Sequence, residues 1–211
     1  MPHVPNINRM TKPDSVDARF DLYMVRSFFN AETCGELIKE LSRCPVSPAT
    51  VYGRGESGAV DERVRKAARL VPSRETFERV SRRLLEYSVE VGEHFGMSFS
   101  VCEEPQFLRY RVGDFFVAHQ DGNTGLLLSD REQSRKVSVV IFLNHQSETP
   151  LAGAYGGGSL VFSDWRASSQ GHSESRMSGE AGTLVTFRSE TTHEVLPVTH
   201  GERYSIVSWY G

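Results

Sequence analysis

Three side chains in the second half of the sequence are of the types that bind metal ions. His119 and Asp121 are separated by one residue, so on a strand they would point to the same side of a sheet. His193 comes much later, at the head of a strand-like segment, and is the candidate for a third ligand. Two imidazoles and one carboxylate on one face of an ion form a facial triad that suits Fe(II) and leaves other coordination positions open. His-x-Asp alone is common by chance, so this hypothesis depends on the surrounding sequence.

Each of these residues also has a purely structural interpretation. His119 could be a buried histidine of the core, and Asp121 could cap a turn. His172 and His200 compete with His193 for the distal position. However, His172 lies in a Ser- and Gly-rich segment and His200 lies beside a Gly turn. We therefore expect His119, Asp121 and His193 to be the metal ligands.

A cation and a hydroxyl near the end of the sequence are suited to an anion. Arg203 and Ser205 alternate along the segment 203–210, whose pattern is that of a strand, so both would point to one side. The planar guanidinium group can bind both oxygens of a carboxylate. An arginine that faces the inside of a barrel is unfavourable unless it meets an anion, whereas one on an edge strand is simply solvated. The first interpretation predicts a carboxylate-binding pair.

The segments that must position these residues are short and rich in β-forming residues. From residue 99 onward we expect strands, separated by Gly-containing turns, at 104–112, 115–119, 137–143, 159–163, 182–188, 194–198 and 203–210. Upstream, capping residues and apolar faces predict helices from Asn30 to before Pro45 and from Ser73 to Gly96, and a short helix is expected over 61–71. The sequence thus predicts a mainly β fold with flanking α, that is, a jelly-roll (double-stranded β-helix) core with N-terminal helices packed outside.

Composition excludes several classes of protein. The 211 residues have a formal net charge of -3, which provides no basic field for nucleic acid. The longest apolar runs fall far short of the ~20 residues of a membrane helix. The three cysteines share no metal-binding spacing, and the N-terminus has no signal-peptide pattern. We expect a cytoplasmic protein without nucleic-acid or membrane partners. A single domain is expected over 1–211. It would consist of a loose leader at 1–18, helical support and a flap loop at 19–98, and a catalytic β-core at 99–211.

Several motifs follow one another in a fixed order around the candidate residues. They are Arg109-Tyr-Arg-Val-Gly113, His119-x-Asp121, VSVVIFLN at 137–144, GGSLVF at 157–162, GTLVTF at 182–187, HEVLPV at 193–198, Gly201-x-Arg203 and Trp209. In this order the sequence resembles the Fe(II)/2-oxoglutarate-dependent dioxygenases, specifically their prolyl 4-hydroxylase-like branch. One motif would mean little, but the ordered set is specific.

The resemblance implies an activity and a metal. His119, Asp121 and His193 would bind Fe(II), and the reaction would consume 2-oxoglutarate and O2, release succinate and CO2, and hydroxylate an unactivated C–H bond. Ascorbate is a candidate reductant. Halogenating relatives replace the triad carboxylate by a small residue to admit chloride, so the presence of Asp121 favours hydroxylation.

The resemblance also implies how the co-substrate is held. Arg203, aided by Ser205, would pair with the far carboxylate of 2-oxoglutarate, and Tyr110 matches a family position that hydrogen-bonds the co-substrate. Collagen-type enzymes more often carry lysine at the position of Arg203, so this residue points toward other branches.

The sequence leaves the substrate open between a prolyl residue of a peptide and a free amino acid or other small metabolite. The loop 50–58 resembles in position a flap that closes over substrate, although an ordinary loop explains it equally well. A catalytically silent module that senses metal or 2-oxoglutarate is the alternative from another class. A cupin-like metal enzyme without 2-oxoglutarate is the third possibility, but it would leave Arg203 unexplained.

Overall fold

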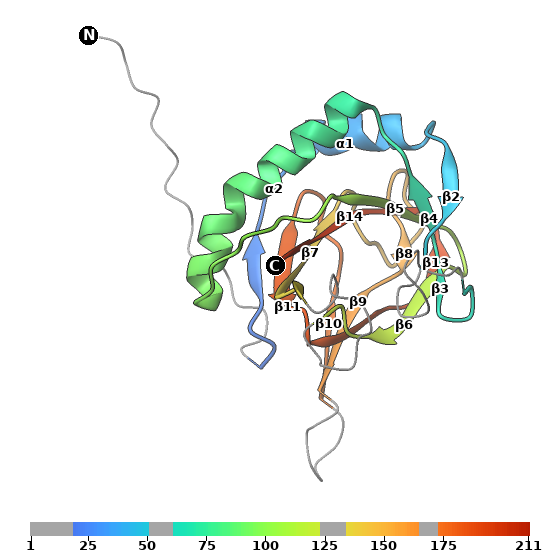
Figure 1. Cartoon of the computed structure of the whole chain (residues 1–211). Helices are drawn as coiled ribbons and strands as arrows, with labels where there is room; N and C mark the ends of the chain where they lie inside the picture. The colour runs from blue at the N-terminus through green and yellow to red at the C-terminus, as the bar shows by residue number, and fades with distance from the viewer. Residues whose placement is uncertain (1–18, 51–60, 123–133, 165–172) are drawn as a thin grey trace.

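The protein is built mainly from β-strands (Figure 1). The computed structural model describes residues 19–50, 61–122, 134–164 and 173–211. Its helices are α1 (Ala31–Leu41) and α2 (Arg74–Phe95). Its strands are β1 (Tyr23–Val25), β2 (Val46–Pro48), β3 (Arg65–Lys66), β4 (Ala68–Leu70), β5 (Gln106–Tyr110), β6 (Phe115–His119), β7 (Val137–Phe142), β8 (Gly156–Gly157), β9 (Leu160–Asp164), β10 (Ser173–Met177), β11 (Leu184–Arg188), β12 (Thr192–Val195), β13 (Val198–His200) and β14 (Arg203–Tyr210).

Both long helices begin at their predicted capping residues; α2 also ends at the predicted glycine, whereas α1 ends at Leu41, ahead of Pro45. The Asn30 side chain accepts a hydrogen bond from the backbone N–H of Thr33 at 2.8 Å and caps α1. Ser73 caps α2 in the same way. Gly96 ends α2 with a φ of 64°, a left-handed conformation that glycine adopts without a steric penalty. The two predicted helices are therefore confirmed.

The strands form two large sheets and one small sheet. The seven-stranded sheet has the order β1-β11-β7-β14-β5-β4-β2, and the five-stranded sheet has the order β10-β9-β12-β6-β3. Strands β13 and β8 form the two-stranded sheet. All pairings within these sheets are antiparallel. Because neighbours in a sheet come from distant parts of the chain, residues far apart in sequence meet inside the fold.

Two apolar clusters lie between the layers of the fold, one between the helices and the seven-stranded sheet and one between the two large sheets. In one, Leu37 of α1 and Leu84 of α2 pack with Ile141 of β7, so the helices cover the outer face of the seven-stranded sheet (Figure 1). In the other, Phe142 of β7 packs with Phe162 of β9 between the two large sheets. The result is the predicted jelly-roll core with N-terminal helices packed outside it.

The prediction was wrong for several segments. The segment expected as a helix over 61–71 instead forms β3 and β4. These strands pair with β6 and β5, and this pairing outweighs the local helix propensity. Strand β10 was missed because its Ser-rich sequence looks like a loop, yet it pairs along its length with β9. The single strand expected at 194–198 is divided into β12 and β13, since Pro197 has no N–H to donate.

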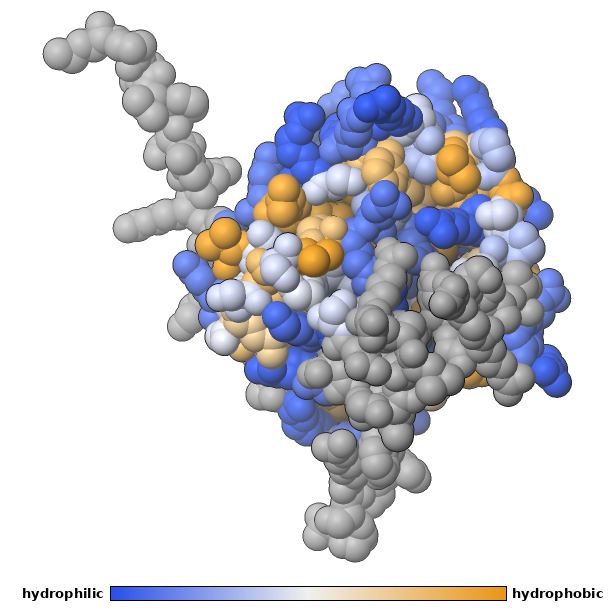
Figure 2. All heavy atoms as spheres, in the orientation of Figure 1, coloured by the Kyte–Doolittle hydropathy of each residue, from blue (hydrophilic) through white to orange (hydrophobic). Residues whose placement is uncertain are grey.

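The surface carries scattered apolar groups. On the face drawn in Figure 2, orange groups are interspersed with hydrophilic ones. No helix in the described ranges is long and apolar enough to cross a membrane. The expected leader at 1–18 lies outside the described residues, and so does the expected flap loop apart from Thr50.

Candidate metal centre and its pocket

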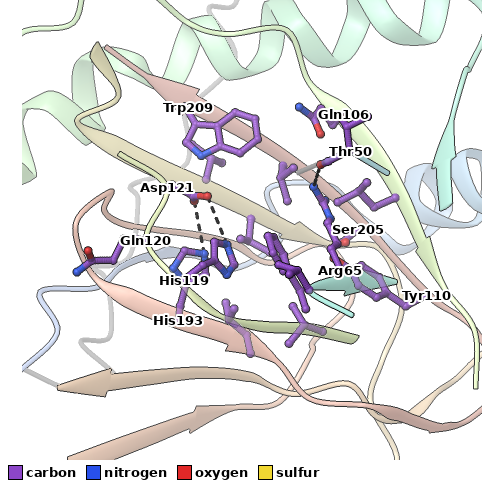
Figure 3. Close-up of a pocket in the computed structure, with 18 of the residues that line it drawn as sticks. Thr50, Arg65, Gln106, Tyr110, His119, Gln120, Asp121, His193, Ser205 and Trp209 are labelled. Carbon is purple, nitrogen blue, oxygen red and sulfur yellow. Dashed lines mark hydrogen bonds and ion pairs between the residues drawn. The ribbon is translucent and has the colours of Figure 1, made fainter. Parts of the chain in front are cut away.

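The fold brings the three predicted metal ligands together. His119 ends β6 and His193 lies on β12, and these residues face each other as partners in the antiparallel register. Asp121 follows β6 by two residues, and its backbone N–H donates to the Ser189 carbonyl at 2.9 Å. The Nε2 atoms of His119 and His193 lie 3.5 and 3.4 Å from the two carboxylate oxygens of Asp121 (Figure 3). One ligand atom from each residue lies within 4.8 Å of the others, so the group can surround one ion.

Backbone carbonyls orient both imidazole rings. Nδ1 of His119 lies 2.8 Å from the carbonyl oxygen of Val117, and Nδ1 of His193 lies 2.9 Å from that of Thr191. A carbonyl oxygen only accepts, so Nδ1 carries the hydrogen in each ring, and a neutral ring then has a free electron pair on Nε2. This is the outer hydrogen bond that metal-binding histidines usually make.

The electrostatics of the group also suit a cation. Burial, together with the nearby His119, lowers the pKa of His193 to about 4, so its ring is neutral at pH 7. Burial opposes the charge on Asp121, but the two imidazoles outweigh it and hold the pKa of this carboxyl well below its usual range. The site therefore offers an ionised carboxylate and a neutral imidazole at His193, beside the second imidazole of His119.

Further side chains hold the carboxylate in place. The Ser138 hydroxyl on β7 donates to Oδ2 of Asp121 at 2.8 Å. Arg135 donates to the Asp121 carbonyl at 3.4 Å, and its guanidinium lies 3.7 Å from the centre of the Trp209 ring. Glu103 accepts two hydrogen bonds from Arg135, at 2.6 and 3.0 Å, so the charge of this arginine is balanced inside the protein.

Arg203 occupies the inner wall between the two sheets. Its side chain is 1% exposed, and Nη1 donates to the Ser205 hydroxyl at 2.9 Å. Its guanidinium carbon lies 5.2 Å from the centre of the Tyr110 ring on the neighbouring strand β5. Its Nε has no hydrogen-bond partner within the described residues. A buried guanidinium with an unused donor is suited to a carboxylate.

The metal group and Arg203 face one cavity of about 130 Å³. Alternation along β14 explains this, because residues 203, 205, 207 and 209 point inward while Tyr204, Ile206 and Tyr210 pack toward the helices. All six predicted site residues line this cavity: Tyr110, His119, Asp121, His193, Arg203 and Ser205. His200, the competing ligand, lies on β13 and does not line it, and His172 lies outside the described residues.

Sequence reasoning missed several residues of the site. Arg135 and Gln106 are buried residues that line the cavity, Arg65 reaches it from β3, and Ser138 is buried behind Asp121. The motif 137–144 contains Ser138, but the alternation of an entirely buried strand does not reveal which face meets the metal. Arg65 lies in the segment that was expected to be helical, so its position on a strand was not predicted.

The geometry fits a divalent metal and a dicarboxylate. Nitrogen and carboxylate donors together match the ligand preference of Fe(II), and they open onto a cavity rather than into packed side chains. At the inner wall of the same cavity, Arg203 and Ser205 provide the cation and hydroxyl that one end of a dicarboxylate requires. A ligand that spans the two groups would satisfy both.

Comparisons with known proteins agree with this arrangement. Residues 105–211 match the family model described as the 2OG-Fe(II) oxygenase superfamily. A PKHD-type hydroxylase from Shewanella oneidensis is 33% identical over 132 residues, which covers 63% of this chain and 52% of that protein. The chain thus spans about half the length of this curated relative.

Two solved structures share the fold. A prolyl-4-hydroxylase from Pseudomonas putida is 24% identical, with a TM-score of 0.67 over 92% of this chain and 93% of that chain. A prolyl hydroxylase from Trichoplax adhaerens, solved with a hypoxia inducible factor oxygen degradation domain peptide fragment, is 17% identical, with a TM-score of 0.67 over 90% of this chain and 83% of that chain. Both likenesses concern the architecture.

Proposed function

Because this chain belongs to the 2OG-Fe(II) oxygenase superfamily, we propose that it hydroxylates an unactivated C–H bond with Fe(II), 2-oxoglutarate and O2. His119, Asp121 and His193 are the proposed iron ligands. The observation that carries the proposal is that these three residues and the buried Arg203 line one cavity. A silent structural barrel would have no need for both groups.

Iron held by His119, Asp121 and His193 would use O2 as the oxidant, so that one oxygen atom would go to 2-oxoglutarate, giving succinate and CO2, and the other would hydroxylate the substrate C–H bond. The protein supplies position. The carbonyls of Val117 and Thr191 keep the two histidines turned toward Asp121, so the donors do not reorganise when the metal enters.

Arg203, Ser205 and Tyr110 form the proposed binding site for the far carboxylate of 2-oxoglutarate. The unused Nε–H of Arg203 can donate to a carboxylate oxygen, while Ser205 already holds the guanidinium in place at 2.9 Å. Arginine binds with a rigid fork, so it fixes the direction of the dicarboxylate as well as its charge. Leu108, Val140 and Val195 give the same cavity apolar walls.

Two classes of substrate are proposed. The names of the relatives favour a prolyl residue or a related amino-acid residue, since curated relatives are PKHD-type hydroxylases and the fold is shared with prolyl hydroxylases. A free amino acid or other small metabolite is the second candidate. The three cysteines are free thiols, which supports a reducing compartment such as the cytoplasm, and ascorbate is the proposed reductant.

Succinate formation tests the proposal. Protein loaded with Fe(II) without oxygen is exposed to air with 2-oxoglutarate, with and without prolyl peptides and free amino acids. We expect His119→Ala and Arg203→Ala to reduce turnover at least 100-fold. The exposed controls His145→Ala and Arg74→Ala should remain within about twofold of the wild type. Tight binding of iron and 2-oxoglutarate with no succinate above the background of the variants would contradict an enzyme and favour a sensor.

A further inference from the structure

We propose that Arg65 binds a carboxylate of the substrate, so that the molecule hydroxylated by this protein is an acid. The inference rests on the proposed function, because it assigns a substrate class to the same cavity. It starts from a buried cation that the iron and co-substrate sites do not use.

Arg65 is held firmly at the cavity wall. Arg65 is 7% exposed, and its Nη1 donates to the Thr50 carbonyl at 3.2 Å. Its guanidinium lies 4.7 Å from the centre of the Phe116 ring, and this ring stacks on His119 with 3.6 Å between ring centres. Arg65 is therefore separated from a proposed metal ligand by one aromatic ring (Figure 3).

The charge of Arg65 is not balanced within the described structure. No carboxylate in the described ranges forms an ion pair with it, and its buried Nε has no hydrogen-bond partner there. A buried cation without an anion is unfavourable, because its charge is removed from water without compensation. By contrast, Arg135 in the same cavity is paired with Glu103.

With metal and co-substrate bound, the charge of Arg65 would remain without a counter-charge among the described residues of the site. Fe(II) and Arg203 together carry three positive charges, and Asp121 and the two carboxylates of 2-oxoglutarate together carry three negative charges, since imidazoles bind a metal as neutral ligands. Arg135 and Glu103 cancel each other. Among the charged described residues that line the cavity, Arg65 is then the one whose charge remains. A substrate with one negative charge would complete the balance.

The neighbouring groups are consistent with a carboxylate beside an apolar body. Gln106 lines the same cavity on the side of Arg65 and Thr50 (Figure 3), and its amide can donate a second hydrogen bond. Leu108 and Val207 provide apolar contact beside these polar groups. A carboxylate held by Arg65 would leave the adjacent carbons directed toward the triad across Phe116. The carboxylate could belong to a free amino acid, to the C-terminus of a peptide or to an acidic side chain.

Binding measurements distinguish these sources. Protein loaded with Fe(II) and 2-oxoglutarate without oxygen is titrated by calorimetry with three sets of probes. The first set is the free amino acids, each compared with its carboxamide. The second is tripeptides that end in proline, with a free or an amidated C-terminus. The third is end-blocked peptides with an internal Asp or Asn beside the proline. We expect one set to contain a carboxylate that binds at least 10-fold more tightly than its amide partner.

The variants decide whether Arg65 is responsible. Arg65→Gln should reduce affinity for the carboxylate about 10–100-fold and leave affinity for its amide partner unchanged, while Arg65→Lys should lose less. Arg63→Gln is the matched control, because Arg63 is an exposed arginine two residues away. The Arg63→Gln protein should bind the probes with the affinity of the wild type. Equal binding of acids and amides, equal affinities in wild type and Arg65→Gln, or no binding of any carboxylate would overturn the proposal.

The experiment also separates the two levels of inference. If wild-type protein with Fe(II) does not bind 2-oxoglutarate, the proposed function fails. If it binds 2-oxoglutarate but prefers neutral probes, only the role of Arg65 fails. Thermal unfolding and the 2-oxoglutarate affinity of Arg65→Gln show whether that variant is folded. If Arg65→Gln is not folded, Arg65→Lys is used as the test instead. An unchanged carboxylate affinity in Arg65→Lys would then count against the proposal.

Discussion

Ser138 illustrates that the metal centre depends on residues behind the ligands. Its hydroxyl donates to Asp121 at 2.8 Å and lies 3.0 Å from the hydroxyl of Ser189. The bond removes one of the orientations that the Asp121 side chain could otherwise adopt. Outer partners of this kind keep a ligand in position before the ion arrives.

We expect Ser138→Ala to weaken Fe(II) binding about 10–100-fold, because the carboxylate loses its fixed orientation. Anaerobic metal titration measures this directly. Ser81→Ala is the control, since the Ser81 hydroxyl bonds only within α2, to the Phe77 carbonyl. An unchanged affinity in Ser138→Ala would show that the backbone alone positions Asp121.

The residues that could be predicted from sequence are those that carry their own chemistry. His119, Asp121, His193 and Arg203 are proposed from their residue types, their spacing and the ordered motifs that surround them. Arg65 was not found, because its relevance comes from Phe116 on the neighbouring strand and from a carbonyl of the preceding loop. Contacts of this kind depend on tertiary structure, and no local pattern encodes them.

At the scale of elements, one carboxylate joins the two helices. Glu40 near the end of α1 accepts a hydrogen bond from the backbone N–H of Ser73 at 2.7 Å and one from the Thr76 hydroxyl at 2.6 Å. Ser73 is the N-cap of α2 and Thr76 lies in its first turn, so Glu40 binds the start of the second helix from the end of the first. Burial opposes the charge on Glu40, but these hydrogen bonds outweigh it and lower the pKa of this carboxyl.

A lowered pKa in the folded state predicts a pH-dependent contribution to stability. Above the pKa of an unfolded glutamate, about 4.3, the ionised Glu40 stabilises the fold, and this contribution is lost as the pH falls through the lower folded value. We expect Glu40→Gln to reduce the free energy of unfolding by about 1 kcal/mol at pH 7, and the difference from wild type to shrink as the pH falls below about 4.3.

Urea unfolding at several pH values measures this effect. Glu36→Gln on the same helix is the control, because Glu36 pairs with Arg79 only at 3.7 Å and on the surface, so its loss should have little effect at any pH. A difference between wild type and Glu40→Gln that stays constant with pH would mean that ionisation of Glu40 does not contribute.

Elements with a strong periodic pattern were predictable, and elements defined by their partners were not. The helix α2 has an apolar stripe and two capping residues, so its limits follow from the sequence. The strands β3, β4 and β10 are short and polar, and they exist because β6, β5 and β9 offer free edges. Local propensity carries no information about such edges.

At the scale of the whole molecule, ligand binding should be coupled to stability. The proposed site takes groups from both large sheets, since Arg203 lies on β14 and His193 on β12. Fe(II) and 2-oxoglutarate would therefore connect the sheets, and a ligand that binds only the folded state stabilises it by mass action.

We expect 2-oxoglutarate at about 100 times its Kd to add roughly 3 kcal/mol to the Fe(II)-loaded protein, which corresponds to a rise in Tm of roughly 5–10 °C. Anaerobic thermal scans test this. In Arg203→Gln the rise caused by 2-oxoglutarate should disappear while the rise caused by Fe(II) remains. Equal 2-oxoglutarate effects in the two proteins would place the co-substrate elsewhere.

The pairing of His193 with His119 has a consequence for the folding of the chain. A shift of β12 by one residue along β6 would turn the imidazole of His193 to the opposite face of the sheet, and the irregularity between His193 and Val195 shows that the pairing is already offset nearby. Iron capture is thus possible in only one alignment of these strands. Bound metal would stabilise the chain in which these strands are correctly aligned, whereas a misaligned chain would not bind the metal.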